Sequence, residues 1–129
     1  MKIYNLLNGL FYILYGLFGA FIPLKMAALM GWELSLLGLH QMRAVSVVMA
    51  SLGLMNVLYA QKQSDQKPLT LAIIFVTLSF MAGRFLGLVL DGAGPSQTYH
   101  EIGIEIIWAG IGFFLLSRQA KLGYERSVD

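Results

Sequence analysis

The chain contains no cysteine at any of its 129 positions. Without thiols it can form no disulfide bond, no thiolate nucleophile and no cysteine-ligated zinc or iron–sulfur centre. Several classes of enzyme are therefore excluded before any motif is considered.

Charged residues are also scarce: they make up 12% of the chain, whereas 57% of its residues are hydrophobic. A typical soluble domain has roughly a quarter of its residues charged. This composition predicts a single all-α integral membrane domain over residues 1–129. The formal net charge of +2 is not concentrated in a basic cluster interleaved with aromatic residues, so we expect no nucleic-acid partner.

Four apolar runs reach the roughly 20 residues that a helix needs to cross the hydrocarbon core. They cover approximately residues 3–22, 42–60, 69–90 and 99–117. The first run is too long for the core of a secretory signal and has no Ala-x-Ala cleavage pattern, so we interpret it as a retained helix. The runs predict four antiparallel transmembrane helices in an up-down bundle.

The segment between the first two runs, residues 23–41, is too apolar for a free loop. We expect a short amphipathic helix there that lies in the membrane interface, with Trp32 at the level of the headgroups.

Basic residues outside the spans gather on one side of this topology. That side holds Lys2, Lys62, Lys67, Arg118, Lys121 and Arg126. The opposite side has only Lys25 outside the spans. The positive-inside rule therefore predicts that both termini are cytoplasmic.

Two charged residues lie inside the apolar runs at matching depth. Arg84 is roughly 9 Å below the end of the third run, and Glu105 is equally far into the fourth. Because an ionisable side chain in hydrocarbon costs a few kcal/mol or more, it normally faces a partner inside the bundle. We therefore predict that Arg84 and Glu105 pair.

Further groups are expected at the same level. Arg43 opens the second run, Asp91 follows Arg84 on one helical face, and Glu101 precedes Glu105 by four residues. Together they predict a nearly charge-balanced buried network in the outer half of the bundle. Candidate general acid/base groups are Glu105 and Asp91. The predicted ligand-binding residues are Arg43, Arg84, Asp91, Glu101, Glu105 and Trp108.

Structural interpretations stand beside the functional ones. The Arg84 pair is equally explained as an ion pair that fixes helix register, and Arg43 as a side chain that reaches the outer headgroups. Gly83 and Gly87 favour close helix packing over a cofactor site, because they lie in mid-helix, and we predict no cofactor. Small and polar residues also form a stripe along the first run: Asn5, Gly9, Tyr12, Gly16 and Gly19. His40 and His100 lie on different helices without ligand spacing, so no metal site is predicted.

Three stretches carry a family resemblance: "QMRAVSVVMASLGLMN", "GRFLGLVLDG" and "HEIGIEIIWAGIG". They resemble the bacterial domain-of-unknown-function family numbered 4345, which consists of small four-helix membrane proteins. The family pattern has an Arg-Ala in the second helix, a Gly-Arg followed by an Asp-Gly at the end of the third, and a glutamate in the fourth. Gln41 departs from it, since the family often has a glutamate there. The matching positions are Arg43, Ala44, Gly83, Arg84, Asp91, Gly92 and Glu105.

The resemblance implies an architecture and a multi-pass location in the bacterial inner membrane, but no activity. We expect a non-catalytic protein that binds a lipid or a quinone-like ligand, or that acts as an accessory to a membrane partner or to a second copy of itself. The alternative is a membrane-embedded acid/base enzyme that acts on a lipid or isoprenoid. A proton-coupled carrier is the weakest interpretation, because the cytoplasmic half of the spans has no ionisable residue.

Overall fold

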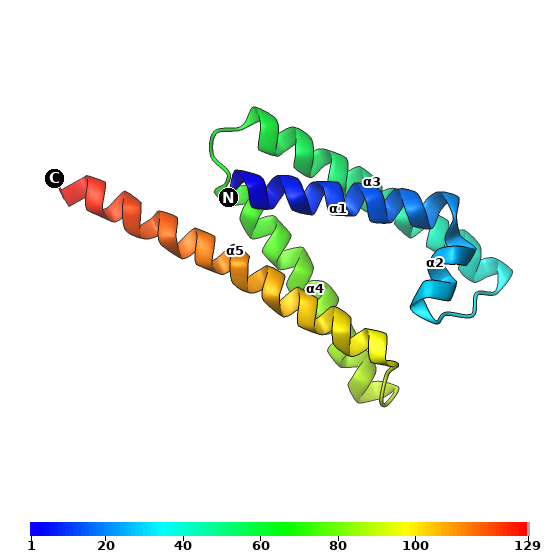
Figure 1. The fold of residues 1–129 in the computed structure, drawn as a ribbon. Coiled ribbons are helices and arrows are strands. Elements are labelled where there is room, and N and C mark those ends of the chain that lie inside the picture. Colours follow the sequence, from blue (N-terminus) through cyan, green and yellow to red (C-terminus); the bar gives the residue numbers. More distant parts are fainter. Residues whose placement is uncertain (129) are drawn as a thin grey trace. The chain divides into compact units, whose positions relative to one another are not determined.

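A computed structural model describes residues 1–128, with the side chains of residues 1–120. Within residues 1–128 the chain forms five helices and no strand (Figure 1). The predicted all-α class is therefore confirmed. The helices are α1 (Lys2–Phe21), α2 (Pro23–Met30), α3 (Leu36–Lys62), α4 (Lys67–Leu90) and α5 (Ser96–Val128).

Four of these helices are long and apolar enough to cross a membrane. They are α1, α3, α4 and the part of α5 up to Ala120, and α4 has the highest mean hydropathy, 2.1. Each corresponds to one of the four predicted apolar runs, within one residue for the first and completely for the other three. The sequence pattern therefore identified the membrane-spanning helices correctly by length and composition.

The start of α3 differs from the prediction. The helix begins at Leu36, whereas the apolar run was placed from residue 42. Ser35 caps it, because its hydroxyl oxygen accepts a hydrogen bond of 3.1 Å from the backbone N–H of Gly38. The polar residues His40 and Gln41 therefore lie within the first turns of α3.

The chain forms two compact units: residues 2–64, and residues 65–128 together with Met1. In the first unit α1 and α3 run side by side in opposite directions (Figure 1). Gly9 of α1 contacts Gly53 of α3, and Gly16 contacts Ala50. Residue numbers thus increase along α1 in the direction in which they decrease along α3.

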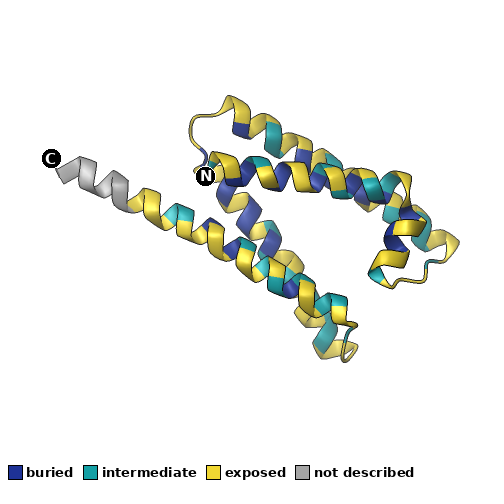
Figure 2. Ribbon diagram, viewed as in Figure 1, coloured by how far each residue is buried: buried dark blue, intermediate teal, exposed yellow. Residues whose placement is uncertain are grey.

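Glycines allow the backbones of α1 and α3 to approach closely. A methyl group added at Gly53 would lie 2.5 Å from the carbonyl oxygen of Gly9, and one at Gly16 would lie 2.5 Å from the backbone nitrogen of Ala50. The amide of Asn56 also donates a 3.0 Å hydrogen bond to Asn8 across this interface. Close approach of this kind is typical of helices that pack in lipid. The stripe expected on the first run is buried in this interface (Figure 2).

A short helix, α2, follows α1 directly. Pro23 occupies its first turn, where its missing N–H costs nothing. The helix ends at Gly31, which has a φ of 69°, and the N–H of Trp32 donates to the carbonyl of Ala27. Met26 is almost completely buried. The expected short helix is therefore present in the segment 23–41, while its position in the membrane interface stays a prediction.

The second unit is the pair α4 and α5, joined by a short connection in which Gly92 has a φ of 91°. Three glycines of these helices do not take part in this contact. A methyl group added at Gly83 would meet no atom within 4 Å, and the same holds for Gly103 and Gly110. The close packing expected at Gly83 and Gly87 is therefore not made with α5. What joins α4 to α5 at this level is the charged cluster described below.

We predict that Gly53→Ala destabilises the protein by about 1–3 kcal/mol, because the added methyl group overpacks the α1–α3 interface. Thermal unfolding in detergent, followed by circular dichroism, would measure the change. Gly103→Ala is the matched control, since its methyl group has open space, and it should leave the midpoint unchanged or raise it slightly. Equal effects of the two substitutions would contradict the close packing of α1 and α3.

Candidate functional site

Arg84 of α4 forms ion pairs with two glutamates of α5. Its Nε donates to Oε2 of Glu101 at 2.8 Å, and its Nη2 approaches the same oxygen at 2.5 Å. Its Nη1 donates to Oε1 of Glu105 at 2.7 Å. One guanidinium therefore bridges two carboxylates and joins the two helices of the second unit.

The sequence positions these groups through helix periodicity. Glu101 and Glu105 are four residues apart on α5, so they project from one face, one turn apart. Arg84 offers five N–H donors in a planar fork, which suits contacts with more than one carboxylate. The Arg84 guanidinium also lies 6.0 Å from the centre of the Phe80 ring, within the range of a cation–π contact.

The predicted buried five-residue network is not found. Among the described side chains the ion pairs join Arg84, Glu101 and Glu105, and these are 25%, 28% and 15% exposed, so the cluster is half-buried. Asp91 lies exposed at the end of α4, where its main-chain N–H donates to the carbonyl of Gly87. Because it follows Arg84 by seven residues, it lies roughly 10 Å further along the helix.

Arg43 belongs to the first unit and has a different partner there. Its Nη1 donates a hydrogen bond to the carbonyl oxygen of Ala20, in the last turn of α1. The last four carbonyls of a helix have no intrahelical donor, and the C-terminal end carries a partial negative charge. Arg43 therefore stabilises the end of α1, a role that the sequence interpretation missed.

One buried carboxylate oxygen of the cluster, Oε2 of Glu105, accepts no hydrogen bond from the described residues. With both carboxylates ionised, the cluster of Arg84, Glu101 and Glu105 carries a formal charge of −1. Trp108 lies one turn further along α5, and its indole nitrogen is also buried. The cluster therefore holds a buried acceptor at Glu105 that a further donor could satisfy.

The sequence of the chain is similar to a known protein family. The family described as domain of unknown function (DUF4345) matches residues 1–116. The chain belongs to this family. No curated protein and no solved structure matches the chain. The match covers all three resembling stretches, so the residues Arg43, Arg84, Asp91 and Glu105 all lie within the DUF4345 region.

The site in this DUF4345 chain contains one partner that the sequence interpretation underestimated. Matching depth pointed to Glu105 as the partner of Arg84, whereas Glu101 makes two of its three contacts. The four-residue spacing of the glutamates was the available signal. Among the described residues no group of three or more His, Cys, Asp or Glu side chains comes together to hold a metal ion.

We predict that Arg84→Ala lowers the free energy of unfolding of this DUF4345 protein by about 1–3 kcal/mol, because both glutamates lose their charged donor. Unfolding in mixed micelles titrated with a denaturing detergent would measure it. Arg118→Ala removes an exposed arginine from the same unit and should have little effect.

The loss caused by Arg84→Ala should shrink when Glu101 and Glu105 are first changed to glutamine, because interacting residues are not additive. If the loss were the same in both backgrounds, the ion pairs would contribute nothing to the packing of α4 against α5.

Proposed function

We propose that the protein is a non-catalytic, membrane-integral binding or accessory protein whose cluster of Arg84, Glu101 and Glu105 receives the polar group of a lipid-like or quinone-like ligand. The observation that supports this is the buried Oε2 of Glu105, which accepts no hydrogen bond from the described residues. A buried acceptor of this kind costs about 1–3 kcal/mol when it lacks a donor. A ligand that supplies the donor recovers that free energy on binding.

The charges of the cluster determine which polar group of a ligand it can bind. Three of the five N–H donors of Arg84 are engaged by the two glutamates, and the formal charge of −1 on the cluster disfavours an anionic ligand. The cluster instead has an excess of acceptors. The matching ligand group is therefore a hydrogen-bond donor such as a hydroxyl, which a quinol or a glycerolipid supplies.

The surroundings favour a ligand with an apolar body. Apolar side chains next to the cluster face outward, with Phe85 and Leu86 of α4 about half exposed and Ile104 of α5 more so. On a helix that spans a membrane, such side chains contact hydrocarbon. A ligand that reaches Glu105 laterally from the lipid would keep its apolar part in that environment.

A second candidate function, acid/base catalysis on a lipid or isoprenoid, is favoured by the same oxygen. A carboxylate oxygen without a competing donor is available to take a proton from a substrate. The arrangement of the other charged groups argues against catalysis. Arg84, the residue that would stabilise developing negative charge, is already paired with both carboxylates. Binding therefore fits the contacts better than turnover.

We expect the purified protein to bind decylubiquinol about tenfold more tightly than decylubiquinone, because only the quinol donates hydrogen bonds. Fluorescence quenching of the tryptophans in detergent would measure both affinities. Glu105→Gln should abolish the preference, since it places an amide where the free acceptor lies, while Arg118→Gln should keep it.

Equal binding of the quinol and the quinone by the wild type would contradict the proposed donor site. Conversion of a bound lipid to a new product by the wild type, lost in Glu105→Gln, would instead support the catalytic alternative.

We also propose that the helices form an up-down bundle in a bacterial inner membrane, with both termini and the connection at Lys62 on the cytoplasmic side and α2 in the opposite interface. The distribution of basic residues supports this orientation. Because the chain has no cysteine, single cysteines can report it cleanly.

We expect Lys62→Cys to resist a membrane-impermeant maleimide in intact cells and to react after permeabilisation. Lys25→Cys and Ala93→Cys, both at exposed positions, should react in intact cells. The reverse pattern would show that the protein is inserted the other way round.

A further inference from the structure

A groove runs along the seam between α1 and α3 in the first unit. It has a volume of about 540 Å³, within the range of about 300–1,000 Å³ typical of ligand pockets. Its walls are almost entirely apolar. Leu17 and Phe21 line it from α1, Val47 and Leu54 line it from α3, and Arg43 is its one charged residue.

The groove matches one leaflet of a bilayer in length. From Arg43 to Leu54, α3 rises roughly 16 Å, and half of a hydrocarbon core of about 30 Å is about 15 Å. Arg43 contacts Ala20 in the last turn of α1, so the charge lies at the end of the membrane-spanning segment. The apolar walls extend from there toward mid-span.

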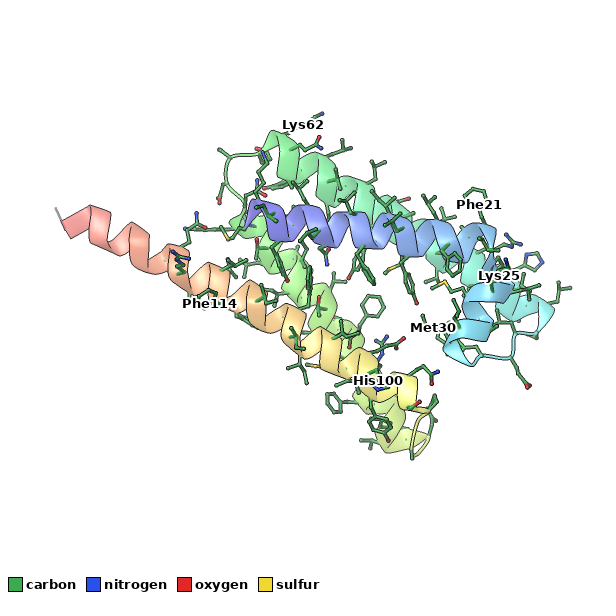
Figure 3. The ribbon with its side chains drawn as sticks, in the orientation of Figure 1. Phe21, Lys25, Met30, Lys62, His100 and Phe114 are labelled. Atoms are coloured by element: carbon green, nitrogen blue, oxygen red, sulfur yellow. The ribbon has the colours of Figure 1, made fainter. Side chains whose placement is uncertain are left out.

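Within the described residues 2–64, Arg43 has donors to spare and pairs with no carboxylate. It donates one hydrogen bond, to Ala20, out of the five N–H groups of its guanidinium. Among the described residues Arg43 forms no ion pair, in contrast to Arg84. The segment 2–64 contains a single acidic residue, Glu33. Lys25 adds a second positive charge at the corner between α1 and α2 (Figure 3).

We infer that this groove binds one acyl chain of an anionic phospholipid, whose phosphate pairs with Arg43. An exposed guanidinium with free donors binds phosphate through paired, charge-assisted hydrogen bonds. The apolar groove below it has the length of an acyl chain within one leaflet. The site is separate from the cluster at Arg84 and does not depend on the function proposed for that cluster.

Native mass spectrometry of the full-length protein, released from nanodiscs that contain equal amounts of phosphatidylglycerol and phosphatidylcholine, tests the inference. We expect the wild type to retain phosphatidylglycerol preferentially. Arg43→Gln should lower its retention roughly tenfold, because the charge-assisted contacts are lost. Equal retention of the two lipids by the wild type would overturn the inference.

A second variant fills the groove and leaves the Arg43 contact with Ala20 in place, in case Arg43→Gln disturbs the end of α1. Ser51 is exposed, lines the groove, and donates to the carbonyl four residues earlier. Ser51→Trp should lower phosphatidylglycerol retention severalfold. Ser79→Trp is its matched control, because Ser79 on α4 is also exposed and makes the same backward hydrogen bond.

Retention unchanged by Ser51→Trp would show that the groove is not the lipid site, for instance because another helix covers it. Glu105→Gln should keep phosphatidylglycerol, whatever it does to quinol binding, so the two proposals can fail independently.

Discussion

Hydrocarbon supplies no hydrogen bonds, and the pairing of Arg84 with Glu101 and Glu105 is how the α4–α5 hairpin meets that constraint. A lone guanidinium would be expensive at this depth, so the glutamates must come from the neighbouring helix. Their four-residue spacing lets both reach one arginine. The pairing joins the two helices of the hairpin, and the buried acceptor left over at Glu105 is a by-product of matching one arginine with two carboxylates.

The two hairpins are held together by different means. In the first, glycines bring α1 and α3 into backbone contact, and an asparagine pair adds one hydrogen bond. In the second, Gly83, Gly103 and Gly110 face open space, and charged side chains bridge the helices. Dispersion contacts between small residues need close shape fit, whereas long charged side chains tolerate a wider separation. The charged contact of the second hairpin therefore does not need the close backbone approach of the first.

Hydropathy alone predicted the helical class and all four membrane-spanning segments, because their length is set by bilayer thickness. Matching depth also predicted the pairing of Arg84 with Glu105. Matching depth also predicted too large a network, because two residues at the same depth in the membrane need not be close to each other. Arg43 lies at the end of a span, but its partner is the carbonyl of Ala20. Asp91 lies just beyond the last residue of α4. The start of α3 was missed because a single capping serine, Ser35, outweighs the polar His40 and Gln41.

The polar face of α1 has a consequence for the synthesis and membrane insertion of the protein. Asn5 and Asn8 are buried, and Asn8 is hydrogen-bonded to Asn56, a residue synthesised much later. Until α3 leaves the ribosome, this face of α1 would meet lipid, and its mean hydropathy of 1.3 is the lowest of the four spans. The hydrogen bond of Asn8 therefore requires α3, so α1 reaches its final packing only once α3 has been synthesised.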